Sequence, residues 1–86
     1  MPRSLTFHDH AWEDYLYWQD TDRTKAKRIN ALLRDVLRHP FRGLGKPEPL
    51  RGDLAGFWSR RIDAEQRLVY SVASDAVIVI QAWQDW

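Results

Sequence analysis

The run FWSRRIDAEQRLVYSV at residues 57–72 carries the strongest indication of the fold. Two β-favouring runs, residues 57–62 and 67–72, flank Asp63-Ala64-Glu65, and this pattern predicts a β-hairpin with a loop of about three residues. The even-numbered side chains are largely apolar, so we expect them to share the core face: Trp58, Ile62, Leu68, Tyr70 and Val72. That arrangement requires residue 62 to pair with 66 and residue 60 with 68.

The predicted register places Arg61 directly opposite Arg67, on the face away from the core together with Ser59. Their β-carbons then lie about 5 Å apart, and two cations this close repel each other unless an anion lies between them. The pair therefore indicates a binding site for phosphate or carboxylate. Ordinary surface ion pairs with Asp63, Glu65 or Asp53 are the alternative. Arg60 falls on the apolar face, and we expect it at the rim.

The sequence before the hairpin predicts a short strand and two consecutive helices. Residues 3–7 alternate polar with apolar side chains, and Asp9 is a candidate helix N-cap. A first helix is expected from about His10 to Gln19, with Trp12 and Leu16 on a stripe that adjoins its core stripe and its aromatic side chains mostly in the core. A second helix is expected to about Arg38. Residues 76–80 form an apolar run typical of a central strand. The predicted fold is α+β: a short N-terminal strand, an αα-hairpin, then an antiparallel sheet of about four strands with the helices on one side.

Length and composition limit the possible classes of protein. The chain has 86 residues, enough for a single domain spanning residues 1–86. It contains no cysteine, which excludes disulfides and thiolate metal sites, and no apolar run is long enough for a signal peptide or a membrane span. We therefore expect a cytoplasmic protein that does not associate with membranes.

Charge is distributed unevenly along the chain although the net charge is only +1. Residues 1–22 carry a net charge of −4, residues 23–51 of +7 and residues 52–86 of −2. A concentrated basic segment is typical of phosphate binding, and a solvated basic face of the second helix is the alternative interpretation.

Glu48 is the candidate proton acceptor beside the arginines. It lies between Pro47 and Pro49, which restrict the backbone, and a carboxylate held there is suited to take a proton from a hydroxyl. The guanidinium groups of Arg61 and Arg67 are suited to stabilise charge that develops on phosphorus.

Several strings resemble the YoeB branch of the RelE-like toxins. They are GKPEPL at residues 45–50, LAGFWSRRI at residues 54–62, QRLVY at residues 66–70, WEDYLYWQ at residues 12–19 and Pro40-Phe41. The resemblance covers nearly the whole chain. It implies a toxin that enters the ribosomal A site and cuts mRNA there without a metal or other cofactor, by attack of the ribose 2′-hydroxyl on the adjacent phosphate.

The resemblance also implies roles and partners. Glu48 is the general base, Arg61 and Arg67 hold the scissile phosphate, and Arg51 stands where the family commonly has lysine. Lys46, Arg51 and Ser59 are the expected substrate-binding residues. The implied partners are a cognate YefM-like antitoxin, the ribosome with its mRNA, and a second copy of the chain in a homodimer.

The C-terminus departs from the family pattern, which usually ends in His-Tyr. Asp85 replaces the histidine that acts as general acid, and Trp86 replaces the tyrosine, although Trp86 still offers a stacking face to a base. Gln66 replaces a further histidine. An aspartate with an ordinary pKa of about 3.9 is ionised at neutral pH and does not readily donate a proton.

Three explanations remain open for this departure. Asp85 is protonated by its surroundings, or Glu48 and the arginines carry a slower reaction, or the protein binds without cutting. A non-catalytic protein that binds the ribosome or the antitoxin and acts in promoter autoregulation is thus the alternative function. A gyrase-poisoning toxin of the related ParE type is disfavoured because Glu48, Arg61 and Arg67 would then have no stated purpose.

Overall fold

The hairpin of residues 57–72 has the predicted register. In the computed structural model, which describes residues 3–84, β3 (Trp58–Arg61) pairs antiparallel with β4 (Gln66–Val72). Arg60 lies opposite Leu68, and Arg61 lies opposite Arg67. The Asp63 carboxylate accepts the N–H groups of Glu65 (2.8 Å) and Gln66 (2.7 Å), which closes the turn and fixes this register.

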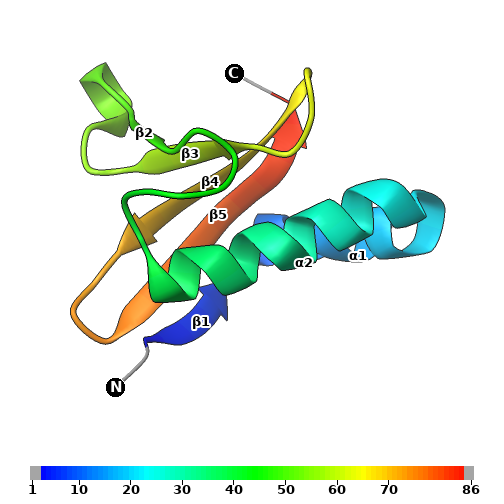
Figure 1. Cartoon of the computed structure of the whole chain (residues 1–86), viewed down its shortest axis with the longest axis horizontal. Coiled ribbons are helices and arrows are strands. Elements are labelled where there is room, and N and C mark those ends of the chain that lie inside the picture. The colour runs from blue at the N-terminus through cyan, green and yellow to red at the C-terminus, as the bar shows by residue number, and fades with distance from the viewer. Residues whose placement is uncertain (1–2, 85–86) are drawn as a thin grey trace.

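One sheet holds all the strands of the described chain, in the order β1-β5-β4-β3-β2 (Figure 1). β1 (Ser4–Phe7) runs parallel to β5 (Ala76–Gln84), while β2 (Glu48–Pro49) is a two-residue edge strand beside β3. The predicted α+β class and the central position of the last strand are confirmed. The four strands β2 to β5 pair antiparallel as expected, and the predicted N-terminal strand β1 joins them as a fifth, parallel to β5.

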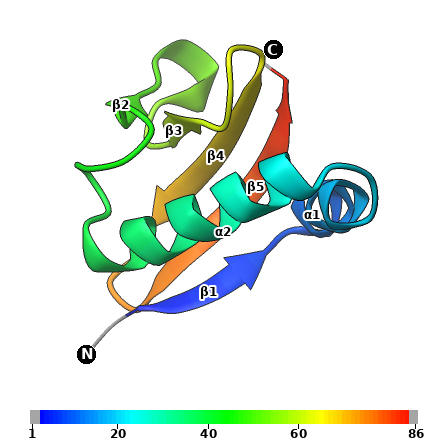
Figure 2. The same cartoon turned by 45° about the vertical axis from the view of Figure 1, so that its right-hand side comes forward.

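Two helices pack on one face of this sheet, with α2 crossing it (Figure 2). They are α1 (Asp9–Thr21) and α2 (Arg23–Arg38), and a 3-10 turn follows at Gly52–Leu54. The Asp22 carboxylate caps α2 by accepting the Lys25 N–H at 3.1 Å. The prediction of Asp9 as N-cap was wrong. The N-cap is His8, whose backbone is extended, and α1 already begins at Asp9.

The core lies between the helices and the sheet. Its buried residues include Ala11, Trp18, Ile29, Leu32, Leu33, Val36, Ile62, Leu68, Tyr70, Val77, Val79 and Ala82. Trp12, which was expected to lie mostly in the core, is 45% exposed, and Leu16 on the same stripe is 36% exposed. The reason is that α1 turns toward β5, where the Trp18 indole N–H donates to the Ala82 carbonyl at 2.7 Å, and this leaves the adjoining stripe outward. No helix within residues 3–84 has the length and apolarity needed to cross a membrane.

Arg60 is fully buried, so the expectation of a rim position was wrong. The segment between α2 and β2 folds over its guanidinium and supplies the acceptors that water would provide at a rim. Those acceptors are Asp35 Oδ2 (2.5 Å) and the carbonyls of His39, Arg42 (2.8 Å) and Leu44 (3.0 Å), while Nε lies 3.1 Å from the Tyr70 hydroxyl. A buried guanidinium is tolerated when a carboxylate neutralises it and its donors are satisfied. This cluster therefore ties β3 to the C-terminal end of α2.

The cluster shifts the ionisation of two of its members. Burial alone would raise the pKa of Asp35, but the hydrogen bonds from Arg60 and from the Leu44 N–H outweigh it, so the pKa lies below the ordinary value of 3.8. Burial raises the pKa of Tyr70 above 10.0, because the phenolate would be desolvated. At neutral pH the cluster therefore contains a carboxylate, a guanidinium and a neutral phenol.

The lowered pKa of Asp35 predicts acid sensitivity. The stability that this carboxylate contributes is complete above its unfolded pKa, near 3.8, and is lost as the pH falls through the lower folded value. We expect Asp35→Asn to flatten the decline in the free energy of unfolding below about pH 4, by at most about 1.4 kcal/mol per pH unit. Urea titrations between pH 2 and pH 7 measure this, and an unchanged slope in the variant would contradict it.

Candidate active site

Arg61 and Arg67 form a cross-strand pair on the face of the sheet opposite the helices. Arg61 is exposed, whereas the Arg67 side chain is only 18% exposed. The pairing places both guanidinium groups over the same part of the outer face, as their register predicted. Two positive charges are thus concentrated at one end of the hairpin.

Glu48 is brought to this pair by β2. It lies opposite Ser59 in the β2–β3 pairing, and the Leu50 N–H donates to the Phe57 carbonyl at 2.9 Å just beyond it. Glu48 Oε1 lies 3.3 Å from Arg67 Nη1, and its side chain remains 58% exposed. The carboxylate and the arginines therefore meet on one open surface, where an incoming molecule can reach them.

The turn before Glu48 depends on two residues with positive φ. Gly45 has φ 81° and Lys46 has φ 52°, which is uncommon for a residue with a side chain. A β-carbon at Gly45 would lie 2.8 Å from Leu32 Cδ2 and 3.1 Å from Arg60 Cβ, so only glycine fits. The Arg61 N–H donates to the Gly45 carbonyl at 2.7 Å. Backbone geometry thus fixes the approach of the chain to Glu48.

The other predicted site residues are placed differently. Lys46 and Arg51 are exposed near β2, and Ser59 is on the outer face but only 2% exposed. Asp85 and Trp86 lie outside the described residues. Within residues 3–84, no group of three or more histidine, aspartate or glutamate side chains is placed to hold a metal ion.

The carboxylate of Asp63, the alternative partner of the arginine pair, is engaged elsewhere. Lys25 Nζ lies 2.7 Å from Asp63 Oδ2, and this contact joins α2 to the hairpin turn. The hydrogen bond to Asp63 raises the pKa of Lys25. Burial alone would raise the pKa of Asp63, but the hydrogen bonds from Lys25 and from the turn N–H groups outweigh it and lower this pKa. Asp63 is therefore a structural residue, whereas the Glu48 carboxylate lies beside Arg67.

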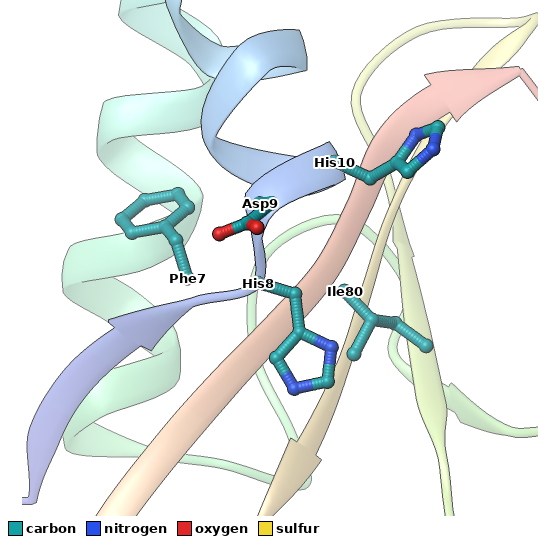
Figure 3. A pocket seen from close by; sticks show the side chains of 5 residues that line it. All are labelled: Phe7, His8, Asp9, His10 and Ile80. Carbon is teal, nitrogen blue, oxygen red and sulfur yellow. The ribbon is translucent and has the colours of Figure 1, made fainter.

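The histidines near the start of α1 line a separate hollow with Phe7, Asp9 and Ile80 (Figure 3). In this view His8, His10 and Ile80 project to one side of the ribbon and Phe7 to the other. The hollow shares no residue with the group formed by Glu48 and the arginines. His39, at the end of α2, contributes its backbone carbonyl to Arg60.

Sequence reasoning missed the supporting residues Arg60, Tyr70 and Asp35. The Tyr70 hydroxyl donates to the Pro40 carbonyl at 2.7 Å, so it holds the same segment as Arg60. The one indication in the sequence was Arg60, an arginine at an otherwise apolar position of the hairpin. That signal does not identify the acceptors, which come from residues 16 to 25 positions away.

Two arginines and an exposed carboxylate thus meet on one face of an α+β fold. A model of the "YoeB-like toxin of bacterial type II toxin-antitoxin system" family matches residues 7–86. The chain belongs to this family, and the resemblance found in its sequence is confirmed.

Individual relatives agree with this assignment. Toxin YoeB of Streptomyces coelicolor is 55% identical over 78 residues, which cover 91% of this chain and 93% of the relative. The solved YoeB/ParE toxin from Agrobacterium tumefaciens has a TM-score of 0.92 at 47% identity, covering 96% of this chain and 99% of its own. YoeB from Staphylococcus aureus, 38% identical and aligned over 100% of both chains, was solved as a dimer (TM-score 0.92) and in a heterotetrameric YoeB–YefM complex (0.90).

The geometry predicts which cations bind a nucleic-acid backbone. For a short single-stranded RNA that carries 2′-O-methyl groups, Arg61→Ala and Arg67→Ala should each reduce the slope of log K against log salt by about 0.7. Glu48→Gln should tighten binding, because it removes a negative charge beside Arg67. Fluorescence anisotropy at several salt concentrations measures both effects.

Arg34→Ala is the control for that measurement, because Arg34 lies on the exposed face of α2. Its slope should match that of the unaltered chain. A reduced slope with Arg34→Ala, together with unchanged slopes for both hairpin arginines, would place the RNA on the helix instead.

Proposed function

We propose that this protein is a ribosome-dependent endoribonuclease that cuts mRNA in the A site and so inhibits translation. The observation that carries the proposal is the 3.3 Å approach of Glu48 Oε1 to Arg67 Nη1, with Arg61 directly across the hairpin from Arg67. This arrangement combines a proton acceptor with two phosphate ligands on an exposed surface. Membership of the YoeB-like toxins supports the ribosome and its mRNA as the target.

In the proposed reaction, Glu48 takes the proton of the ribose 2′-hydroxyl as the 2′-oxygen bonds to the adjacent phosphorus. The bond from phosphorus to the 5′-oxygen breaks, which leaves a 2′,3′-cyclic phosphate and a 5′-hydroxyl. Arg61 and Arg67 neutralise the charge that develops on the phosphate oxygens. The arginines supply this positive charge themselves, so the scheme includes no metal ion.

The surrounding residues hold the RNA and complete the proton balance. The exposed cations Lys46 and Arg51 bind neighbouring phosphates, and Ser59 supports Glu48 from the adjacent strand. Trp86 stacks on a base. The departing 5′-oxygen receives its proton from Asp85 when that carboxyl is protonated, or from water, and the second route makes the reaction slower.

The proposed partners follow the relatives. A cognate YefM-like antitoxin neutralises the toxin, as the S. aureus YoeB–YefM complex suggests, and the S. aureus YoeB dimer supports a homodimer. The protein acts in the cytoplasm, where its ribosomal target lies. Asp85 favours a second candidate, a family member that binds ribosome or antitoxin without cutting and serves in promoter autoregulation.

Cleavage mapped by primer extension during translation of a defined mRNA tests the proposal. Glu48→Gln should lower the cleavage rate by about 10²–10⁴-fold, and Arg67→Ala by about 10²–10³-fold. Asp85→His should raise it, because a histidine donates a proton at neutral pH. Glu65→Gln alters an exposed carboxylate in the hairpin turn and should cut at the unaltered rate.

Two outcomes would change the conclusion. Equal cleavage by the unaltered chain and Glu48→Gln would reject the assignment of the base. Cleavage by Asp85→His alone would show that the natural protein is the non-catalytic binder.

A further inference from the structure

The buried cluster around Arg60 faces the loop that carries the proposed general base. Arg60 binds the carbonyls of His39, Arg42 and Leu44, and it is joined there by Asp35, which accepts the Leu44 N–H at 3.0 Å. The Tyr70 hydroxyl holds the Pro40 carbonyl. Residues 39–44 are therefore held at four carbonyls and one N–H by three side chains, which we call the Arg60 clamp: Asp35, Arg60 and Tyr70.

The distance along the chain from the clamp to Glu48 is short. Gly45 lies against Arg60 Cβ and accepts the Arg61 N–H, and only Lys46 and Pro47 separate it from Glu48. Three trans peptide units span at most about 11 Å, and the proline ring fixes one φ angle between them. A displacement at Gly45 is thus passed on to Glu48 with little loss.

The far side of Glu48 offers a weaker hold. β2 has two residues, one of them Pro49, which has no N–H to donate to the ladder. The Leu50 N–H bond to the Phe57 carbonyl follows at once. So short an edge strand is marginal by itself, and the clamp is the stronger of the two attachments.

We propose that Asp35, Arg60 and Tyr70 are positioning residues for the reaction: they set the place of the Glu48 carboxylate relative to Arg61 and Arg67 without touching the RNA. This inference rests on the proposed function for its catalytic consequence. Arg60 and Arg61 are neighbours in β3, so one strand orients both the clamp and the phosphate ligand. A loosened clamp leaves Arg61 and Arg67 in place and moves only the Glu48 carboxylate. The chemical step is then slower while RNA binding persists.

Two variants loosen the clamp by different amounts. Tyr70→Phe keeps the aromatic ring and removes the hydroxyl between Arg60 and the Pro40 carbonyl. Arg60→Lys keeps the positive charge but loses the planar fork that reaches several acceptors at once. Ile29→Val is the matched control, because it removes one methylene from a fully buried site on α2 away from the loop.

Steady-state cleavage on programmed ribosomes, from which kcat and KM are obtained, tests the proposal. Tyr70→Phe should lower kcat roughly tenfold and Arg60→Lys roughly a hundredfold, with KM changed less than about twofold. Ile29→Val should retain the unaltered kcat even where its loss of thermal stability equals that of Tyr70→Phe. An unaltered kcat in Tyr70→Phe, or an equal fall in Ile29→Val, would overturn the inference.

Hydrogen exchange at single amides separates failure of the inference from failure of the proposed function. The Leu44, Leu50 and Arg61 amides should exchange faster in Tyr70→Phe, while those in the first half of α2 should keep their protection. If the unaltered chain cuts no RNA, the proposed function fails and this exchange pattern still decides whether the clamp holds the loop. Protection lost equally throughout the chain, or unchanged at Leu50, would show that it does not.

Discussion

The Arg60 guanidinium is buried against the Asp35 carboxylate, and the surrounding elements are arranged around this contact. It joins β3, the C-terminal end of α2 and the loop between them, three parts of the chain that have no regular backbone pairing with one another. A charge in the core is costly unless it is neutralised and its donors are satisfied, so the loop has to close over it in one conformation. The irregular segment of residues 39–44 thereby takes a defined conformation, because its carbonyls must satisfy the buried guanidinium.

Successive side chains of β3 point to opposite faces of the sheet. Arg60 points into the core and Arg61 points away from it, so two identical neighbours have opposite tasks. The pairing with β4 adds Arg67 beside Arg61, and the pairing with β2 adds Glu48. The sheet thus places the two arginines and the loop positions Glu48, so three charged groups meet on one face of an 86-residue chain.

Local pattern predicted most of the fold and the grouping of the site. Period-two alternation in residues 57–72 was sufficient for the hairpin register, and hence for the meeting of Arg61 with Arg67. The burial of Arg60 was not predictable, since its acceptors belong to a loop far away in sequence whose conformation no local pattern specifies. The expected burial of Trp12 was wrong for a related reason: helical periodicity identifies an apolar stripe but not how much of it the sheet covers.

A structure of the chain bound to an RNA with a 2′-deoxy group at the cleavage position would show whether the clamped loop sets Glu48 against a phosphate held by the hairpin arginines. We expect the scissile phosphate between Arg61 and Arg67, with a Glu48 oxygen about 3 Å from where the missing 2′-oxygen would be. RNA lying along the exposed face of α2, or Glu48 turned away from the phosphate while Arg60 keeps its acceptors, would contradict it.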